Sequence, residues 1–135
     1  MAETFQFEIV TPERQVASGE AEEMQIPAKN GYIGVLPHHA PLITELAVGE
    51  ISYRLGAKTE RLALAWGFAE VLPDKVTVLA ETAERAGEID VQRAQRARER
   101  AEERLRSSGS ETDFARAGTA LKRAETRIEV AEKRS

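Results

Sequence analysis

The first 80 residues carry short apolar runs separated by turn-forming residues. Phe5, Phe7 and Ile9 alternate with polar residues, which is the period of a half-buried strand. Further apolar runs follow at Met24–Ile26, Ile33–Leu36, Ile51–Leu55, Leu62–Trp66, Phe68–Leu72 and Val76–Leu79. Turn signals such as Ser18-Gly19 stand between them. Several short strands at this spacing predict an antiparallel sandwich or barrel of eight to ten strands.

The chain changes character near Glu81, where prolines stop and Ala, Arg and Glu, all good helix formers, dominate. Asp90 can cap a first helix, whose apolar positions are Ala94, Ala97, Ala101 and Leu105. Residues 107–110 break the pattern, and Ser110 with Asp113 makes a capping-box-like start for a second helix. Its apolar positions, three and four apart, are Phe114, Ala117, Leu121, Ala124, Ile128 and Ala131. We therefore expect a β-sandwich domain over residues 1–86 and an antiparallel helical hairpin over residues 87–135.

The seam between the two expected helices is mostly alanine. Each alanine buries one methyl group, so the hairpin gains little from apolar burial at about 25 cal/mol per Å². We interpret the hairpin as a weakly held element that can open or extend. A closed, rigid hairpin is the alternative, and the pattern leaves both open.

Composition and charge exclude several classes of protein. The chain has 135 residues, no cysteine and a net charge of −4, so it has no disulfide framework and no thiol nucleophile. Binding of nucleic acid through phosphate neutralisation is not expected at this charge. No run of about 18 apolar residues occurs, so we expect no direct membrane insertion. The N-terminus has no basic segment followed by an apolar stretch, and we expect no secretory signal.

The loop over residues 31–41 holds both histidines of the chain, His38 and His39, among glycines and prolines. It lacks the Gly-Lys-Ser/Thr of a phosphate loop. We favour structural hydrogen bonding for both histidines and predict no metal site and no catalytic residue. An enzyme with an acid/base pair such as His39 and Glu45 is a remote rival, because no nucleophile motif accompanies it. The acidic cluster Glu20, Glu22 and Glu23 lacks calcium-loop spacing, and we expect a solvated edge there.

Arginines on the two helices form a further pattern. Arg93, Arg96 and Arg100 fall on one side of the first helix. Arg123 and Arg127 are four apart on the second, and neither has an acidic neighbour three or four residues away. In a closed hairpin the two sets could meet around an anion, since guanidinium groups suit phosphate oxygens. A polyphosphate such as ATP is a candidate ligand. The alternative, favoured by spacing alone, is a solvated arginine face or ion pairs with another subunit.

Three collinear motifs resemble those of one family. Residues 31–42, Gly-Tyr-Ile-Gly-Val-Leu-Pro-His-His-Ala-Pro-Leu, are similar to the Gly-x-x-Gly-x-x-Pro-x-His-Ala-Pro segment of the epsilon subunits of bacterial F-type ATP synthases. Residues 65–71 with 76–80, and residues 89–94, resemble the family's second and third signatures. The resemblance covers essentially the whole chain. It implies a ten-stranded β-sandwich followed by two α-helices.

The resemblance implies a non-catalytic rotor subunit in the central stalk. The sandwich is expected to bind the gamma subunit and to rest on the c-ring of the membrane sector, coupling proton flow to ATP synthesis. The C-terminal helices are expected to fold on the sandwich, or to extend into the catalytic alpha/beta head and inhibit ATP hydrolysis. The expected location is peripheral, on the cytoplasmic face of the cell membrane. A free-standing ATP sensor is the alternative function.

The family's nucleotide motif, Ile/Leu-Asp-x-x-Arg-Ala, matches here at residues 89–94. With the second-helix arginines it implies a tentative ATP site made of Asp90, Arg93, Arg123 and Arg127, with Glu84 and Arg100 as additions. ATP would be a regulatory ligand, and no cofactor is required. The ring-facing turn is expected at Asn30, Gly31 and Tyr32. Two departures from the family stand out: Trp66 replaces a glycine, and Tyr32 stands where some relatives have an acidic residue.

Overall fold

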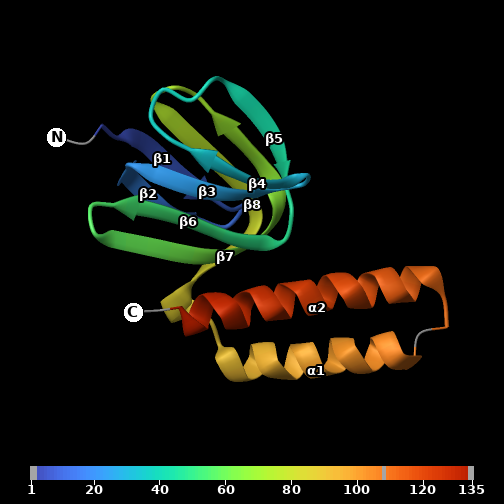
Figure 1. Ribbon diagram of the computed structural model, residues 1–135. Coiled ribbons are helices and arrows are strands. Elements are labelled where there is room, and N and C mark those ends of the chain that lie inside the picture. The colour runs from blue at the N-terminus through green and yellow to red at the C-terminus, as the bar shows by residue number, and fades with distance from the viewer. Residues whose placement is uncertain (1–2, 108, 134–135) are drawn as a thin grey trace.

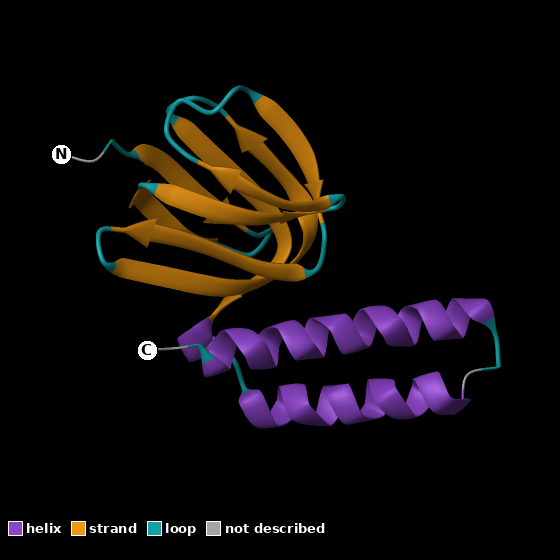
Figure 2. Ribbon diagram, viewed as in Figure 1, coloured by secondary structure: helices purple, strands orange, loops and turns teal. Residues whose placement is uncertain are grey.

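A β-sandwich is followed by two antiparallel helices in the computed structural model, which describes residues 3–107 and 109–133 (Figures 1 and 2). The eight strands of the described residues are β1 (Phe5–Val10), β2 (Gln15–Ala21), β3 (Glu23–Ala28), β4 (Gly31–Val35), β5 (Leu42–Leu46), β6 (Gly49–Leu55), β7 (Lys58–Val71) and β8 (Lys75–Arg85). A short 3₁₀ helix, η1 (Ala86–Glu88), leads to α1 (Val91–Ser107) and α2 (Glu111–Glu132). The predicted sandwich and hairpin are confirmed.

The strands curl into a closed structure in the order β2-β1-β8-β7-β5-β3-β4, with β6 bridging β3 and β7. Pairing is antiparallel except between β1 and β8, which run parallel. Alternate residues of each strand therefore point into one core. Ile9, Met24, Ile26, Ile51 and Leu62 are among its fully buried side chains.

The count of eight strands is lower than the ten that the resemblance implies, and β7 explains part of the difference. The runs predicted as separate strands at Leu62–Trp66 and Phe68–Leu72 belong to one strand of 14 residues. Its first half pairs with β6 and its second half with β5, so one strand serves both layers. The predicted turn at Ser18-Gly19 was wrong. Both residues lie within β2, paired with β1, because Gly19 tolerates a φ of 155° inside the ladder.

The middle of β7 adopts unusual backbone angles. Trp66 has a φ of 60°, which is rare for a bulky residue, and Gly67 has a φ of 125°. A Cβ atom added at Gly67 would lie 2.0 Å from the carbonyl oxygen of Leu79 on β8. Glycine is thus required here for the close approach of two backbones, whereas the tryptophan that departs from the family pattern sits in a strained position.

Side-chain caps fix both helix starts as the sequence predicted. The backbone N–H of Arg93 donates to Asp90 Oδ1 at 3.1 Å, and the N–H of Asp113 donates to Ser110 Oγ at 3.2 Å. The alanine seam is confirmed at its centre, since Ala94, Ala101, Ala117, Ala124 and Ile128 are all buried.

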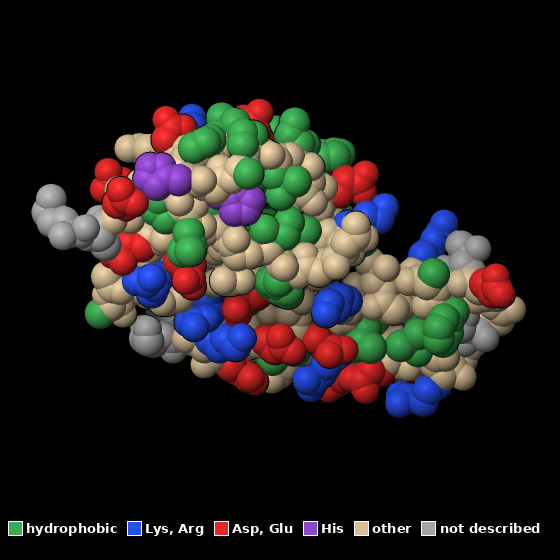
Figure 3. Space-filling model, turned by 45° about the horizontal axis from the view of Figure 1, so that its top comes forward, with side chains coloured by type: hydrophobic (Ala, Val, Ile, Leu, Met, Phe, Trp, Pro, Cys, Tyr) green, Lys and Arg blue, Asp and Glu red, His purple; other side chains and the backbone are tan. Residues whose placement is uncertain are grey.

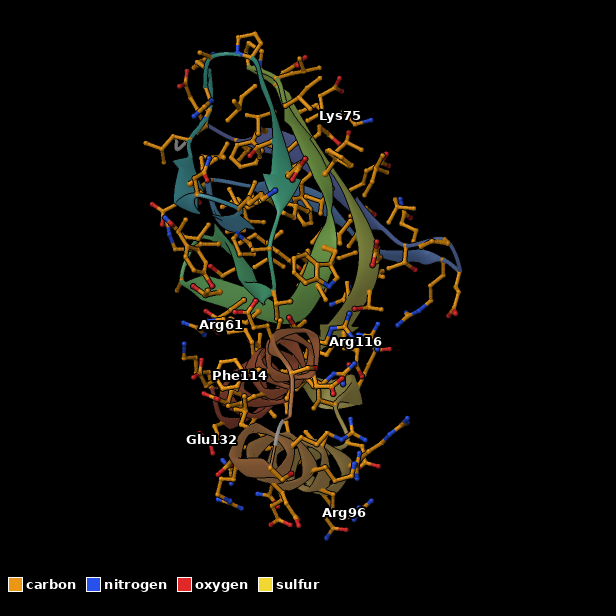
Figure 4. All side chains as sticks on the ribbon, turned by 90° about the vertical axis from the view of Figure 1, so that its right-hand side faces the viewer. Arg61, Lys75, Arg96, Phe114, Arg116 and Glu132 are labelled. Carbon is orange, nitrogen blue, oxygen red and sulfur yellow. The ribbon has the colours of Figure 1, made fainter. Side chains whose placement is uncertain are left out.

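Phe114 was wrongly expected in this seam, because its side chain is 57% exposed. It lies in the first turn of α2, next to the loop that joins the two helices, at the end of the hairpin (Figure 4). None of the helices in the described part of the chain is long and apolar enough to cross a membrane.

The second helix lies between the sandwich and α1 (Figure 1). Its seam residues face α1, while Thr126 and Val130, both buried, belong to a different face. Val130 is fully buried against Ala63 of β7 and Ile89, with Ala86 and Ala131 beside them. This small cluster, which we call the docking cluster, is separate from the sandwich core.

We expect Gly67→Ala to lower the free energy of unfolding by about 3 kcal/mol or more, because the new methyl group meets a backbone carbonyl that cannot move aside. Gly56→Ala is the matched control. Gly56 also has a positive φ, 63°, but a Cβ atom there meets nothing within 4 Å. The free energy of unfolding of Gly56→Ala should fall only by the cost of a positive φ for alanine, about 1 kcal/mol. Urea unfolding measures the free energy of unfolding of both variants. Equal losses of this free energy would contradict the prediction and show that β8 moves to accommodate the methyl group.

Candidate functional site

Four of the six predicted nucleotide-site residues line one small cavity where the hairpin meets the sandwich. Glu84 comes from the end of β8, Asp90 from the residue before α1, Arg93 from α1 and Arg127 from α2. With Ala94 they enclose a volume of about 110 Å³. The cap at Asp90 directs the first turn of α1 toward β8, and the docking of α2 brings Arg127 to the same point.

An ion pair already joins two of these residues. Arg127 Nε donates to Glu84 Oε1 at 2.6 Å, and the two side chains are 37% and 33% exposed. Spacing along α2 could not reveal this pair, because Glu84 lies 43 residues before Arg127. The Asp90 carboxylate is also engaged, as the acceptor of the helix cap. Both carboxylates of the cavity are thus occupied by groups of the chain itself.

The remaining predicted residues lie at different distances from this cavity. Arg123 lies one helical turn before Arg127, and the two line an adjoining narrow cleft over Ala65 and Thr82. Arg100 is exposed and lines neither cavity. Arg96, expected on the same side of α1, points away from α2 (Figure 4). The structure therefore places five of the six predicted residues together or next to one another, and Arg100 apart.

The docking cluster was not predicted, although it holds the hairpin to the sandwich. Thr126 and Val130 are four residues apart, between the seam positions, and this offset pattern is the signal that could have revealed a second buried face on α2. Two ion pairs with Glu50 of β6 accompany it. Lys133 Nζ lies 3.2 Å from one carboxylate oxygen, and Arg61 Nε lies 3.7 Å from the other.

Both histidines lie in the loop before β5. His38 has a φ of 67°, and its Nε2 lies 3.2 Å from a carboxylate oxygen of Glu3, with both side chains largely exposed. His39 Nδ1 lies 2.7 Å from the carbonyl oxygen of Ala40. Glu45, the remote rival's second residue, pairs with Lys29 at 3.1 Å. Within residues 3–107 and 109–133, no three His, Asp or Glu side chains gather as metal ligands.

Glu22 departs from the solvated edge that the sequence predicted for its cluster. Its carboxylate accepts from the backbone N–H of Gly56 at 2.8 Å and from Arg54 Nη1 at 3.1 Å. These two contacts hold the pKa of Glu22 below its ordinary value, with the backbone hydrogen bond as the larger cause. The residue therefore ties β3 to the turn between β6 and β7.

The predicted ring-facing turn lies between β3 and β4. Asn30 and Gly31 are exposed, and Gly31 has a φ of 126°. The Tyr32 side chain is 60% exposed, yet its hydroxyl oxygen accepts from the backbone N–H of Glu50 at 3.0 Å. The turn is therefore exposed at Asn30 and Gly31, while the Tyr32 side chain is held in place by its hydrogen bond to Glu50.

An apolar patch covers the outer face of β5, β7 and β8. Phe68 and Leu79 are cross-strand partners, 52% and 56% exposed, and Ile43 on β5 is 71% exposed. A cavity of about 430 Å³ adjoins Phe68 and Leu79 beside Val10 and Pro12, whereas Ile43 is not part of its lining. We call these five residues the outer apolar patch. Figure 3 shows apolar side chains and both histidines gathered over the sandwich, whereas charged side chains crowd the hairpin. Exposed apolar groups at this density mark an interaction surface.

Family comparisons agree with this two-part architecture. The model described as "ATP synthase, Delta/Epsilon chain, beta-sandwich domain" matches residues 4–86, and "ATP synthase, Delta/Epsilon chain, long alpha-helix domain" matches residues 88–132. The class defined is therefore a small sandwich with an appended helical hairpin, as found in rotary ATP synthases. The chain belongs to the ATP synthase delta/epsilon family, as an epsilon-type subunit.

Curated relatives support this placement along nearly the whole chain. The ATP synthase epsilon chain of Koribacter versatilis is 69% identical over 111 residues, covering 82% of this chain and 78% of the relative. That of Syntrophobacter fumaroxidans is 52% identical over 133 residues, covering 98% and 99%. Among solved structures, a chain in the Euglena gracilis mitochondrial ATP synthase has a TM-score of 0.82 at 23% identity. It covers 96% of this chain and 81% of that one, and it shows the shared fold.

We expect Val130→Ala to raise the opening of the hairpin about tenfold, because removing two methyl groups from the docking cluster costs about 1.5 kcal/mol. Hydrogen exchange of the amides of α2 measures the opening. Val91→Ala is the matched control. Val91 is 37% exposed on α1, and its loss should leave exchange nearly unchanged. Equal protection in both variants would mean that the docking cluster does not hold the hairpin.

Proposed function

We propose that this epsilon-type subunit is a non-catalytic part of the central stalk that couples rotation, driven by proton flow, to ATP synthesis and restrains ATP hydrolysis. Residues 1–86 and 87–135 would act as separate domains with these two tasks. The observation that carries the proposal is the narrow contact between them. Val130 with its neighbours Ala63, Ile89, Ala86 and Ala131, together with a few ion pairs, holds α2 to the sandwich. Little packing is lost when such a contact opens.

The gamma subunit is the proposed partner of the outer apolar patch. Phe68 and Leu79 are large, exposed cross-strand partners, and Ile43 lies exposed on the neighbouring strand β5. The cavity beside Val10 and Pro12 leaves room for a side chain of the partner. Such a patch on a small domain supports a stable protein contact rather than a free surface. The free-standing ATP sensor, our alternative, needs no partner there, so co-purification with gamma distinguishes the two functions.

The turn at Asn30, Gly31 and Tyr32 is the proposed contact with the c-ring of the membrane sector. Its rim is exposed and polar, and it lies at the end of a short hairpin whose strands β3 and β4 pair over five residues. This contact would place the subunit peripherally on the cytoplasmic face of the cell membrane. The aromatic ring of Tyr32 would replace polar contacts that an acidic residue makes in some relatives.

The hairpin is the proposed inhibitory element. Folded, α2 lies on β6, β7 and η1, as the structure shows. Released, it would extend along gamma into the catalytic alpha/beta head and obstruct rotation in the hydrolysis direction. The alanine-rich seam favours this because, apart from Ile128 and the half-buried Leu105 and Leu121, parting the two helices costs mainly alanine methyl contacts.

ATP is the proposed regulatory ligand of the folded form. Its phosphates would bind Arg93, Arg123 and Arg127, and Arg100 would join only after a change of rotamer. The cavity of about 110 Å³ suits a phosphate group and not a whole nucleotide, whose sites typically exceed about 300 Å³. Binding therefore requires Glu84 and Arg127 to separate, and ATP competes with an internal ion pair. A ligand that binds only the folded form shifts the equilibrium by its differential affinity.

We expect the full chain to suppress ATP hydrolysis by the catalytic head with gamma, and a version ending at Gly87 to bind gamma without suppressing it. The truncated version keeps all eight strands but lacks both helices. Phosphate release is measured without the chain, with the full chain and with the truncated version. Binding of both versions with no inhibition by either would leave a coupling subunit with another use for its helices. If neither version binds gamma, the ATP sensor becomes the better function.

We expect Arg123→Ala to weaken ATP binding to the isolated full chain about tenfold or more, because a charge-assisted hydrogen bond contributes about 1.5–3 kcal/mol. Calorimetric titration measures the Kd. Arg96→Ala is the matched control, since it removes the same charge from a side chain that points away from α2. A similar loss in both variants would indicate a general effect of charge, and no loss in either would place ATP elsewhere.

A further inference from the structure

Glu50 contacts both the turn proposed to meet the c-ring and the C-terminal end of the hairpin proposed to extend along gamma. Its backbone N–H donates to the Tyr32 hydroxyl at 3.0 Å, and Tyr32 belongs to the turn proposed to meet the ring. Its carboxylate oxygen Oε1 accepts from Lys133 Nζ at 3.2 Å, and Lys133 follows the last residue of α2. One residue at the start of β6 thus contacts both the turn and the end of the mobile helix.

The Tyr32 contact is fixed by a glycine. A Cβ atom added at Gly49 would lie 2.9 Å from the Tyr32 hydroxyl and 2.7 Å from Cβ of Pro27. The tyrosine side chain can therefore reach across the start of β6 only because position 49 has no side chain. Although 60% of Tyr32 is exposed, its hydroxyl group has a defined position on the backbone of this strand.

Arg61 gives the Glu50 carboxylate a second cationic partner besides Lys133. Its Nε lies 3.7 Å from the other Glu50 oxygen, Oε2, and Figure 4 places Arg61 on the part of the sandwich next to the hairpin. The Glu50 side chain is only 19% exposed, so an unpaired carboxylate there would be unfavourable. When Lys133 leaves, Arg61 still balances the charge. The carboxylate thus has two acceptable states, one with the helix docked and one without.

We propose that Glu50 couples the turn to the hairpin. When a partner engages Tyr32, the hydroxyl leaves the Glu50 amide, the start of β6 relaxes, and the carboxylate turns from Lys133 toward Arg61. Docking of the turn thereby loosens α2. By linkage, release of α2 changes the affinity of the turn for its partner by the same factor. This inference rests on the proposed contact between the turn and the ring.

A double-mutant cycle in the isolated full chain tests the coupling without any partner. Tyr32→Phe removes only the hydroxyl group, and Lys133→Gln removes only the charge. Each alone should raise hydrogen exchange of the amides around Val130 about threefold, the size expected for one hydrogen bond or one partly exposed ion pair. The double variant should exchange about as fast as Lys133→Gln alone. Lys58→Gln, which breaks an exposed pair with Glu60, should change nothing.

Two results would overturn the coupling. If the double variant shows the product of the two single effects, the turn and the helix end act independently. If Tyr32→Phe leaves exchange unchanged, the hydroxyl does not hold the strand.

A second experiment adds purified c-ring to the full chain. Exchange around Val130 should rise severalfold in the natural chain and stay unchanged in Tyr32→Phe, whose hairpin is already loosened. A ring that binds without changing exchange in the natural chain contradicts the coupling. A ring that does not bind at all contradicts the proposed function of the turn, while the double-mutant cycle still decides whether Glu50 joins turn and helix.

Discussion

The docking of α2 on the sandwich is the contact on which the state of the hairpin depends. Among the described residues, Val130 is the fully buried large side chain that joins α2 to β7 and η1, and it packs against Ala63 and Ile89. Alone it contributes about 1.5–3 kcal/mol, which is a small sum for an element of two helices. Because α2 lies between the sandwich and α1, release of α2 would also free α1 from the sandwich, whether or not the seam between the helices then opens. A contact of this size is consistent with the hairpin mobility that we propose.

Electrostatic contacts surround this apolar cluster without replacing it. Arg127 with Glu84 lies on one side, and Lys133 with Glu50 on the other. Each pair joins α2 to a different strand, β8 or β6, so together they oppose rotation of the helix about Val130. Both pairs are partly exposed, and such pairs are screened by salt and individually weak. We propose that both pairs are exchangeable: an ATP phosphate would take the place of Glu84, and Arg61 would balance the charge of Glu50 when Lys133 leaves.

The sequence predicted the strands and helices well because their signals lie in residues close together along the chain. Alternation around Phe7, the cap at Asp90 and the alanine spacing each depend on neighbours within a few residues. The failures all involve distant residues. The runs on either side of Gly67 looked like two strands, since nothing in the local pattern shows that β8 pairs with both of them, while β6 pairs with the first and β5 with the second. Phe114 has the spacing of a seam residue, but its burial depends on where the first helix ends.

In the candidate site, too, the residues with local signals could be predicted and the contacts between distant residues could not. Arg123 and Arg127 could be chosen from the sequence as cations without local partners, and Asp90 and Arg93 from the motif at residues 89–94. The pairing of Arg127 with Glu84 could not be predicted, because this contact exists only once α2 is docked on the sandwich. The pair changes the chemistry of the site. A cluster of arginines alone is open to any anion, whereas an anion that binds Arg127 here must first displace the Glu84 carboxylate. In the ATP binding that we propose, the phosphates therefore compete with an internal ion pair, and the cost of breaking that pair weakens the binding of every anion by the same free energy.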